Sequence, residues 1–169
     1  MTTPAERLAA LDAAQRRKVL RGFTTEQLAQ LPYCWELWAR PEQLPPPGLW
    51  RTWLYLAGRG AGKTRSAAEA IRAAVESGEC TQIGIIAPTA EALRRVCVEG
   101  PSGILAVHPP NERPTYEMSL GRLTWPNGAQ AQLFTAEEPE RLRGPNLSLL
   151  CGRMKSAPSQ TRRRPGIWR

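Results

Sequence analysis

The sequence predicts an α/β fold, a partial parallel sheet with flanking helices, and three observations favour it. Two short apolar runs, residues 50–56 and 82–87, have the aromatic and β-branched content of buried strands. Between them, residues 62–77 are rich in alanine, carry an apolar stripe at helical spacing and stop at Gly78. A strand, a helix and a second strand in this order predict a right-handed βαβ unit.

A glycine-rich loop joins the first predicted strand to this helix. It reads Ala57-Gly58-Arg59-Gly60-Ala61-Gly62-Lys63-Thr64. The glycines permit positive φ angles and leave backbone N–H groups accessible, and a helix N-terminus behind such a loop attracts anions. Lys63 can reach the terminal phosphates of a nucleotide, and the Thr64 hydroxyl can ligate Mg²⁺.

The loop departs at one position from the Walker A pattern G-x-x-x-x-G-K-S/T, because Ala57 stands where the first glycine is usual. The alternative is a chance glycine-rich turn with an exposed lysine. Since a strand is predicted before the loop and a helix after it, we interpret residues 57–64 as a nucleotide-phosphate site of the P-loop type.

Composition bounds the class of protein. A length of 169 residues suits one domain, and no apolar run approaches the roughly 18 residues of a membrane span. The four cysteines are widely spaced with no C-x-x-C pair, so neither a zinc site nor a disulfide framework is indicated, and a reducing cytoplasm is expected. The single histidine, His108, precedes two prolines in a predicted loop and is typical of a solvated side chain.

The net charge of +8 is unevenly distributed along the chain. Residues 1–140 hold 15 basic and 15 acidic side chains, whereas residues 141–169 hold eight basic side chains and no acid. The sequence thus predicts a neutral domain with a basic end, rather than a uniformly basic protein.

Three segments are predicted. Residues 1–48 form a helical N-terminal region, with a helix over 4–20, a capping box between Thr24 and Gln27, and a proline-rich linker over 41–48. Residues 49–146 form an incomplete P-loop ATPase domain, in which 115–136 make a β-meander with a hairpin at Asn127-Gly128. Residues 147–169 form a basic, disordered tail.

Five stretches, taken together in their order and spacing, carry a resemblance to a known family: residues 56–65, 86–89, 98–104, 123–129 and 137–145. Over about residues 50–145 the chain resembles the large terminase subunit of tailed bacteriophages and gene-transfer particles. The resemblance implies a helicase-like P-loop NTPase fold. It also implies an ATP-driven motor that packages double-stranded DNA into capsids.

The resemblance further implies roles for single residues and partners. Lys63 and Thr64 would bind the phosphates of ATP and Mg²⁺, and Arg59 would sense the γ-phosphate. Arg141 and Arg143 would have a nucleotide- or DNA-linked role, or none. The implied partners are double-stranded DNA, the small terminase subunit and the capsid portal, with no membrane, in the cytoplasm of a bacterial host or lysogen.

One departure from the family is decisive for activity. Hydrolysis needs an apolar strand ending in Asp-Glu, which the family places shortly after the Arg-Gly-Pro turn, but no acid follows Glu140 here. The coupling motif and the nuclease domain are also missing from the sequence. We therefore expect Mg-ATP binding with little turnover, and a frameshift near residues 146–151 is our hypothesis for the departure.

Two other functions stay open at this point. One is a different P-loop ATPase, such as a helicase, which would depend on single-stranded DNA. The other is a non-catalytic nucleic-acid-binding protein that uses the basic residues Arg162, Arg163 and Arg164.

Overall fold

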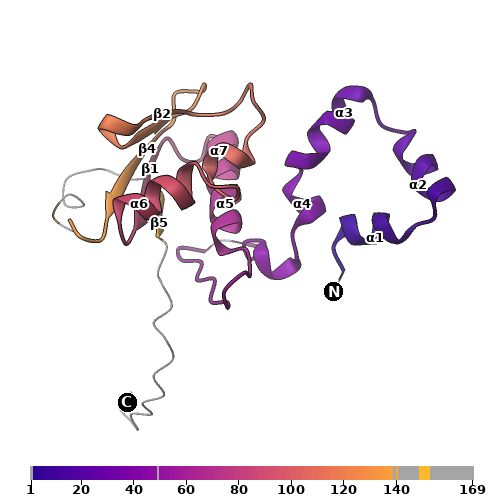
Figure 1. The fold of residues 1–169 in the computed structure, drawn as a ribbon, viewed down its shortest axis with the longest axis horizontal. Coiled ribbons are helices and arrows are strands. Elements are labelled where there is room, and N and C mark those ends of the chain that lie inside the picture. The colour runs from indigo at the N-terminus through magenta and orange to yellow at the C-terminus, as the bar shows by residue number, and fades with distance from the viewer. Residues whose placement is uncertain (1, 49, 139, 141–148, 153–169) are drawn as a thin grey trace, which may run out of the picture.

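The computed structural model describes residues 2–48, 50–138, 140 and 149–152 (Figure 1). It has two regions. Residues 2–48 form a curved helical arm, and residues 63–138 with 149–152 form a body in which helices flank a mixed sheet. The predicted α/β class is confirmed. Among the described residues, no helix is both long enough and apolar enough to cross a membrane.

The arm consists of short helical elements. They are α1 (Pro4–Ala10), α2 (Ala13–Leu20), α3 (Thr25–Gln30), η1 (Leu31–Tyr33), α4 (Trp35–Trp38) and η2 (Pro41–Gln43). The body begins with α5 (Lys63–Glu76), β1 (Gln82–Ala87), α6 (Ala90–Ala92), the π-helical turn η3 (Leu93–Val98) and α7 (Ile104–Val107). It continues with β2 (Thr115–Glu117), η4 (Met118–Leu120), β3 (Arg122–Thr124), β4 (Gln130–Thr135) and β5 (Leu149–Gly152).

The sheet has the strand order β2-β3-β4-β1-β5. Strands β2, β3 and β4 are antiparallel neighbours and form the predicted meander, with Leu123 of β3 opposite Ala131 of β4. Strand β1 runs parallel to both β4 and β5. The predicted helix over 62–77 and the predicted strand over 82–87 are therefore confirmed as α5 and β1.

The predicted strand over residues 50–56 is wrong. These residues are extended but pair with no strand in the described part of the chain, and Leu54 and Leu56 are 66% and 82% exposed. A strand needs a neighbour for its backbone N–H and C=O groups, and none of the five strands of the described sheet pairs with these residues. The βαβ unit predicted to start at residue 50 is consequently absent, and the parallel pairs are β1 with β4 and with β5.

The core of the body lies between α5, η3, α7 and one face of the sheet. Ile71 and Val75 of α5 are each 2% exposed, and Leu123 of the meander is fully buried. The turn between η3 and α7 allows no side chain at Gly103, because a Cβ there would lie 2.6 Å from the Val98 carbonyl oxygen. The glycine in this turn therefore lets α7 approach the core closely.

His108 is buried, which corrects the prediction of a solvated side chain. It is 1% exposed, its Nδ1 lies 2.7 Å from the Ile104 carbonyl oxygen, and its Nε2 accepts a 2.8 Å hydrogen bond from the indole N–H of Trp125. Burial is the main cause that lowers the pKa of His108. The neutral ring, with the proton on Nδ1, joins the end of α7 to the turn after β3.

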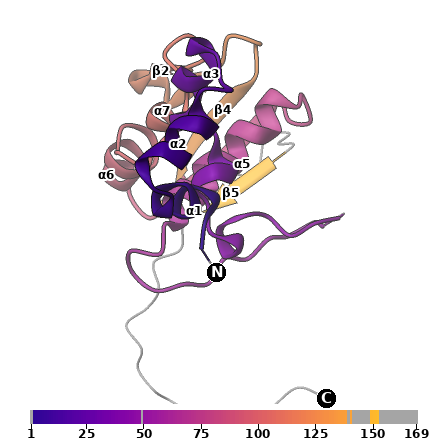
Figure 2. The same cartoon turned by 90° about the vertical axis from the view of Figure 1, so that its right-hand side faces the viewer.

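Figure 2 shows the short helices of the arm end to end. Local capping stabilises α1, α2 and α3. The predicted capping box at Thr24 and Gln27 is confirmed, with hydrogen bonds of 3.2 and 2.9 Å. The helix predicted over 4–20 is instead two helices, because the Asp12 carboxylate accepts the N–H groups of Ala14 and Gln15 and starts α2. No residue of α1, α2, α3 or α4 is buried.

Strand β5 lies within the range that the sequence assigned to a basic tail. The other residues of that range, 147–148 and 153–169, lie outside the described residues, as do Arg141 and Arg143.

Candidate functional site

The glycine-rich loop ends at the first turn of α5. Gly60 and Gly62 adopt φ angles of +80° and +84°, a conformation that side chains rarely tolerate. Gly62 is the N-cap of α5 and supplies no side-chain acceptor to the N–H groups of the first turn. These N–H groups therefore remain available to an anion at the positive end of a 14-residue helix.

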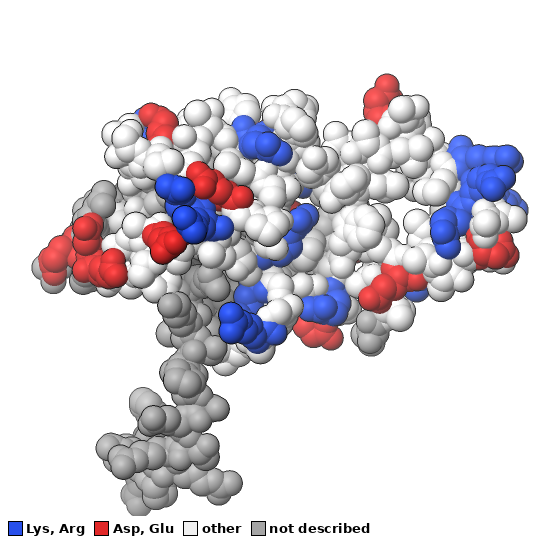
Figure 3. Space-filling model, in the orientation of Figure 1, with Lys and Arg blue, Asp and Glu red and all other residues white. Residues whose placement is uncertain are grey.

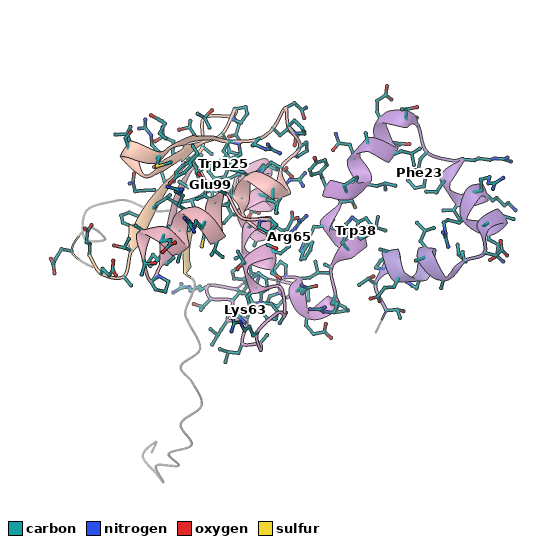
Figure 4. The ribbon with its side chains drawn as sticks, in the orientation of Figure 1. Phe23, Trp38, Lys63, Arg65, Glu99 and Trp125 are labelled. Atoms are coloured by element: carbon teal, nitrogen blue, oxygen red, sulfur yellow. The ribbon has the colours of Figure 1, made fainter. Side chains whose placement is uncertain are left out.

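The Lys63 ammonium is held over the loop. Its Nζ donates to the carbonyl oxygens of Ala57 at 2.8 Å and Gly58 at 2.6 Å. The loop thus curves around its own lysine, and a positive charge lies beside the first turn of α5. Figure 4 shows Lys63 at the end of the body opposite Trp125, whereas Arg65 lies on the side that faces the arm.

Thr64 and Arg59 lie on either side of Lys63 along the chain and differ in exposure. Thr64 is half-buried in the first turn of α5, directly after Lys63. Arg59 is exposed, and it forms no ion pair with any residue that the structure describes. A Cβ at Gly58 or at Gly60 would meet no atom within 4 Å, so this side of the loop has open space for a ligand.

Three side chains that the sequence reasoning missed hold the loop from the arm side. The Ala61 carbonyl oxygen accepts hydrogen bonds from the Arg40 guanidinium at 3.0 Å, the Gln43 amide at 3.3 Å and the Tyr55 hydroxyl at 3.0 Å. Gln43 is 7% exposed, and its Oε1 accepts the backbone N–H of Arg40 at 2.9 Å. The segment predicted as a plain proline-rich linker, residues 41–48, therefore contains one residue that positions the loop, Gln43, and Arg40 directly before it is a second.

The backbone at position 62 favours glycine, because its φ angle is +84°. A Cβ there would also overlap the Gln43 amide nitrogen, so the Gln43 side chain would have to move away from the loop. Nothing in the local sequence predicts that Arg40 and Gln43 contact Ala61, since they are separated from it by 18 residues or more.

The opposite side of α5 carries an ion-pair cluster, which borders a pocket between α5 and the arm. Glu69 is 3% exposed and accepts two hydrogen bonds from Arg65, whose guanidinium lies 5.6 Å from the ring centre of Trp35. Burial raises the pKa of Glu69, against the opposing effect of Arg65. Arg72 donates to the carbonyl oxygens of Tyr33 and Val107 and so links the arm to α7.

Carboxylates that could hold a metal or activate water are not gathered in the described part of the chain. No group of three or more His, Cys, Asp or Glu side chains has metal-binding geometry there. After β5 the sequence continues with Arg153 and contains no acid. The arrangement can bind phosphate through Lys63 and the first turn of α5, but it offers no general base beside them.

The chain matches the model of one protein family, described as terminase large subunit, T4likevirus-type, N-terminal. The match covers residues 54–151, which is more than half of the chain, and it runs past Pro145 into β5. This match confirms the resemblance drawn from the five sequence stretches. No curated protein and no solved structure matches the chain.

Proposed function

The chain belongs to the T4-like family of terminase large subunits, and we propose that it binds Mg-ATP as the N-terminal part of the motor that packages double-stranded DNA. The observation that carries this proposal is the position of the Lys63 ammonium. The ammonium lies on two loop carbonyl oxygens, beside a helix N-terminus without a side-chain cap. When a nucleotide binds, the Lys63 ammonium would exchange these contacts with carbonyl oxygens for contacts with phosphate oxygens.

The residues present fit such a ligand. Two glycines of the loop have positive φ angles, the first turn of α5 has no side-chain cap, and the lysine supplies the charge. Thr64 would hold Mg²⁺, which supplies charge neutralisation of the phosphates when bound. Arg59, exposed on the loop, would contact the terminal phosphate.

We propose further that hydrolysis by this chain is slow. A catalytic carboxylate is needed to orient water, and the chain contains no acid after Glu140. We therefore expect measurable ATP affinity with a low rate of hydrolysis, because Lys63 is available for phosphate binding and no carboxylate directly follows β5 to activate water.

Titration of the full chain with a fluorescent ATP analogue tests the binding. We expect Lys63→Ala to weaken the affinity tenfold or more in the presence of Mg²⁺. A matched control is Arg95→Ala, which removes one positive charge from an exposed side chain that pairs with Glu91. Equal affinity in the wild type and Lys63→Ala would contradict the proposal.

Phosphate release from ATP tests the second part. We expect near-background rates for the wild type, with or without duplex DNA. A hydrolysis rate that depends on Lys63 and rises with double-stranded DNA would contradict slow turnover, and a rise with single-stranded DNA alone would favour a helicase.

A further inference from the structure

We propose that the basic face of α2 and its C-terminal end binds the phosphate backbone of double-stranded DNA. This face consists of Arg17, Lys18 and Arg21, and we call it the α2 basic face. The choice of duplex DNA over another polyanion rests on the proposed function, whereas the site itself is separate from the Lys63 loop.

The charges of this face are not used within the described structure. All three side chains are exposed, and none forms an ion pair with another described residue. Three exposed arginines of the body differ, because Arg94, Arg95 and Arg122 are each paired with a glutamate. Arg113 is exposed and, like the α2 basic face, has no ion pair with a described residue. Figure 3 shows a group of blue side chains over α2, with a red side chain at its lower edge, whereas blue and red side chains lie next to each other in several places on the body.

The acids next to this face are already engaged. The Glu6 carboxylate accepts the backbone N–H of Thr3 at 2.8 Å, and the Asp12 carboxylate accepts two N–H groups at the start of α2. Both carboxylates therefore face helix N-termini. The positive charges at the opposite end of α2 lie near the partial negative charge of the helix C-terminus, but no carboxylate among the described residues forms an ion pair with them.

A neighbouring arginine fixes the position of the face. The Arg16 guanidinium donates to the carbonyl oxygens of Ala9 at 2.7 Å and Leu11 at 2.9 Å, across the corner between α1 and α2. Of the consecutive basic residues 16–18, the first thus secures the corner and the other two are presented outwards. Arg17 and Arg21 are one helical turn apart, so their Cα atoms are about 6 Å from each other along the helix axis.

This geometry suits a phosphate backbone better than a membrane surface. Each DNA strand carries one charge per about 3.4 Å of helix axis, so a row of three cations can contact successive phosphates. A membrane-bound helix needs a broad apolar face opposite its cations. On α2, the large exposed apolar side chain is Val19 alone, at 46% exposure.

Salt-dependent binding of the full chain to a fluorescent 20-base-pair duplex tests the proposal. The arm variant is Arg17→Ala/Lys18→Ala/Arg21→Ala, and the matched control is Arg94→Ala/Arg95→Ala/Arg122→Ala, which removes the same charge from the body. We expect the arm variant to lower the slope of log affinity against log salt by about 2–3, at roughly 0.9 per phosphate contact. The control is expected to change the affinity no more than twofold.

Several outcomes would overturn the proposal. Equal losses in the two variants would mean that net charge alone matters. Tighter binding of single strands, or binding of anionic phospholipid vesicles but not of duplex DNA, would exclude the proposed partner. Circular dichroism of both variants shows whether α2 is retained. Nucleotide affinity, measured in parallel, separates a failure here from a failure of the Lys63 site.

Discussion

The arm and the body of this chain are stabilised in different ways. The body has a continuous core in which Ile83, Val107 and Leu123 are at most 1% exposed. The helices α1, α2, α3 and α4 of the arm bury no residue, and Val19, Phe23 and Trp38 are each more than 40% exposed. The arm instead relies on capping boxes and on a few hydrogen bonds to the body.

The difference shows that local capping can define where the helices of the arm begin, whereas the stability of the body comes from its buried core. Capping fixes where a helix starts but contributes only about 1 kcal/mol at each site. Burial of large apolar side chains contributes more for each residue. We therefore expect the arm to open locally at a low free-energy cost while the body unfolds as one unit.

The largest expected effect comes from the core of the body. Leu123→Ala removes a fully buried side chain, and we expect a loss of about 2–5 kcal/mol in the free energy of unfolding. Urea denaturation followed by tryptophan fluorescence measures it. The arm counterpart Leu28→Ala, at a side chain 39% exposed, should change the value by less than about 0.5 kcal/mol. Similar losses in both variants would remove the distinction between the regions.

The next effect depends on pH and is confined to the body. Because burial lowers the pKa of His108 in the folded state, the unfolded chain takes up the proton first, below its ordinary pKa of about 6.5. Stability from this group is therefore complete above pH 6.5 and is lost as pH falls towards the folded pKa. Since His108 is the only histidine, proton NMR reports its titration directly. An ordinary pKa in the folded chain would contradict the burial.

A smaller effect is expected in the arm. Thr24→Ala removes the side-chain acceptor of the α3 capping box, and we expect about 1 kcal/mol less local stability. Amide hydrogen exchange should become faster in α3 and stay unchanged in α5 and β1. Thr24→Ser, which keeps the hydroxyl, is the control. Faster exchange in the body as well would show that the two regions unfold together.

The smallest effect is expected on the surface of the body. Arg95 and Glu91 form a 3.3 Å ion pair in which both side chains are about 70% exposed. We expect Arg95→Ala to change the free energy of unfolding by less than about 0.5 kcal/mol, because solvent screens such pairs. A loss above 1 kcal/mol in the same denaturation experiment would mean that the pair does more than its exposure suggests.

The sequence predicted those parts of the fold that local signals specify. The alanine-rich stripe of α5, the β-branched run of β1 and the Asn127-Gly128 hairpin each contain their own pattern, and each is confirmed. The stretch over 50–56 has the composition of a strand, but a strand also needs a neighbour, which composition does not reveal. Local reasoning failed at this point because pairing is a tertiary property.

In the candidate site, too, the local motif was predictable from the sequence and the long-range contacts were not. The motif located the loop and Lys63, and the structure gives that loop the expected positive φ angles. Arg40 and Gln43 were missed because they reach Ala61 across 18 residues or more of sequence. The burial of His108 was missed as well, since nothing next to it in the sequence indicates that Trp125 is its partner.

The exposed leucines before the glycine-rich loop affect how long the chain is expected to persist in a cell. Leu54 and Leu56 lie outwards, while Trp53 and Tyr55 stack on each other with ring centres 6.1 Å apart. An extended segment with exposed leucines is the type of surface that chaperones hold and proteases cut. We therefore expect the cellular half-life of the chain to depend on how soon these leucines are covered, more than on the stability of the core.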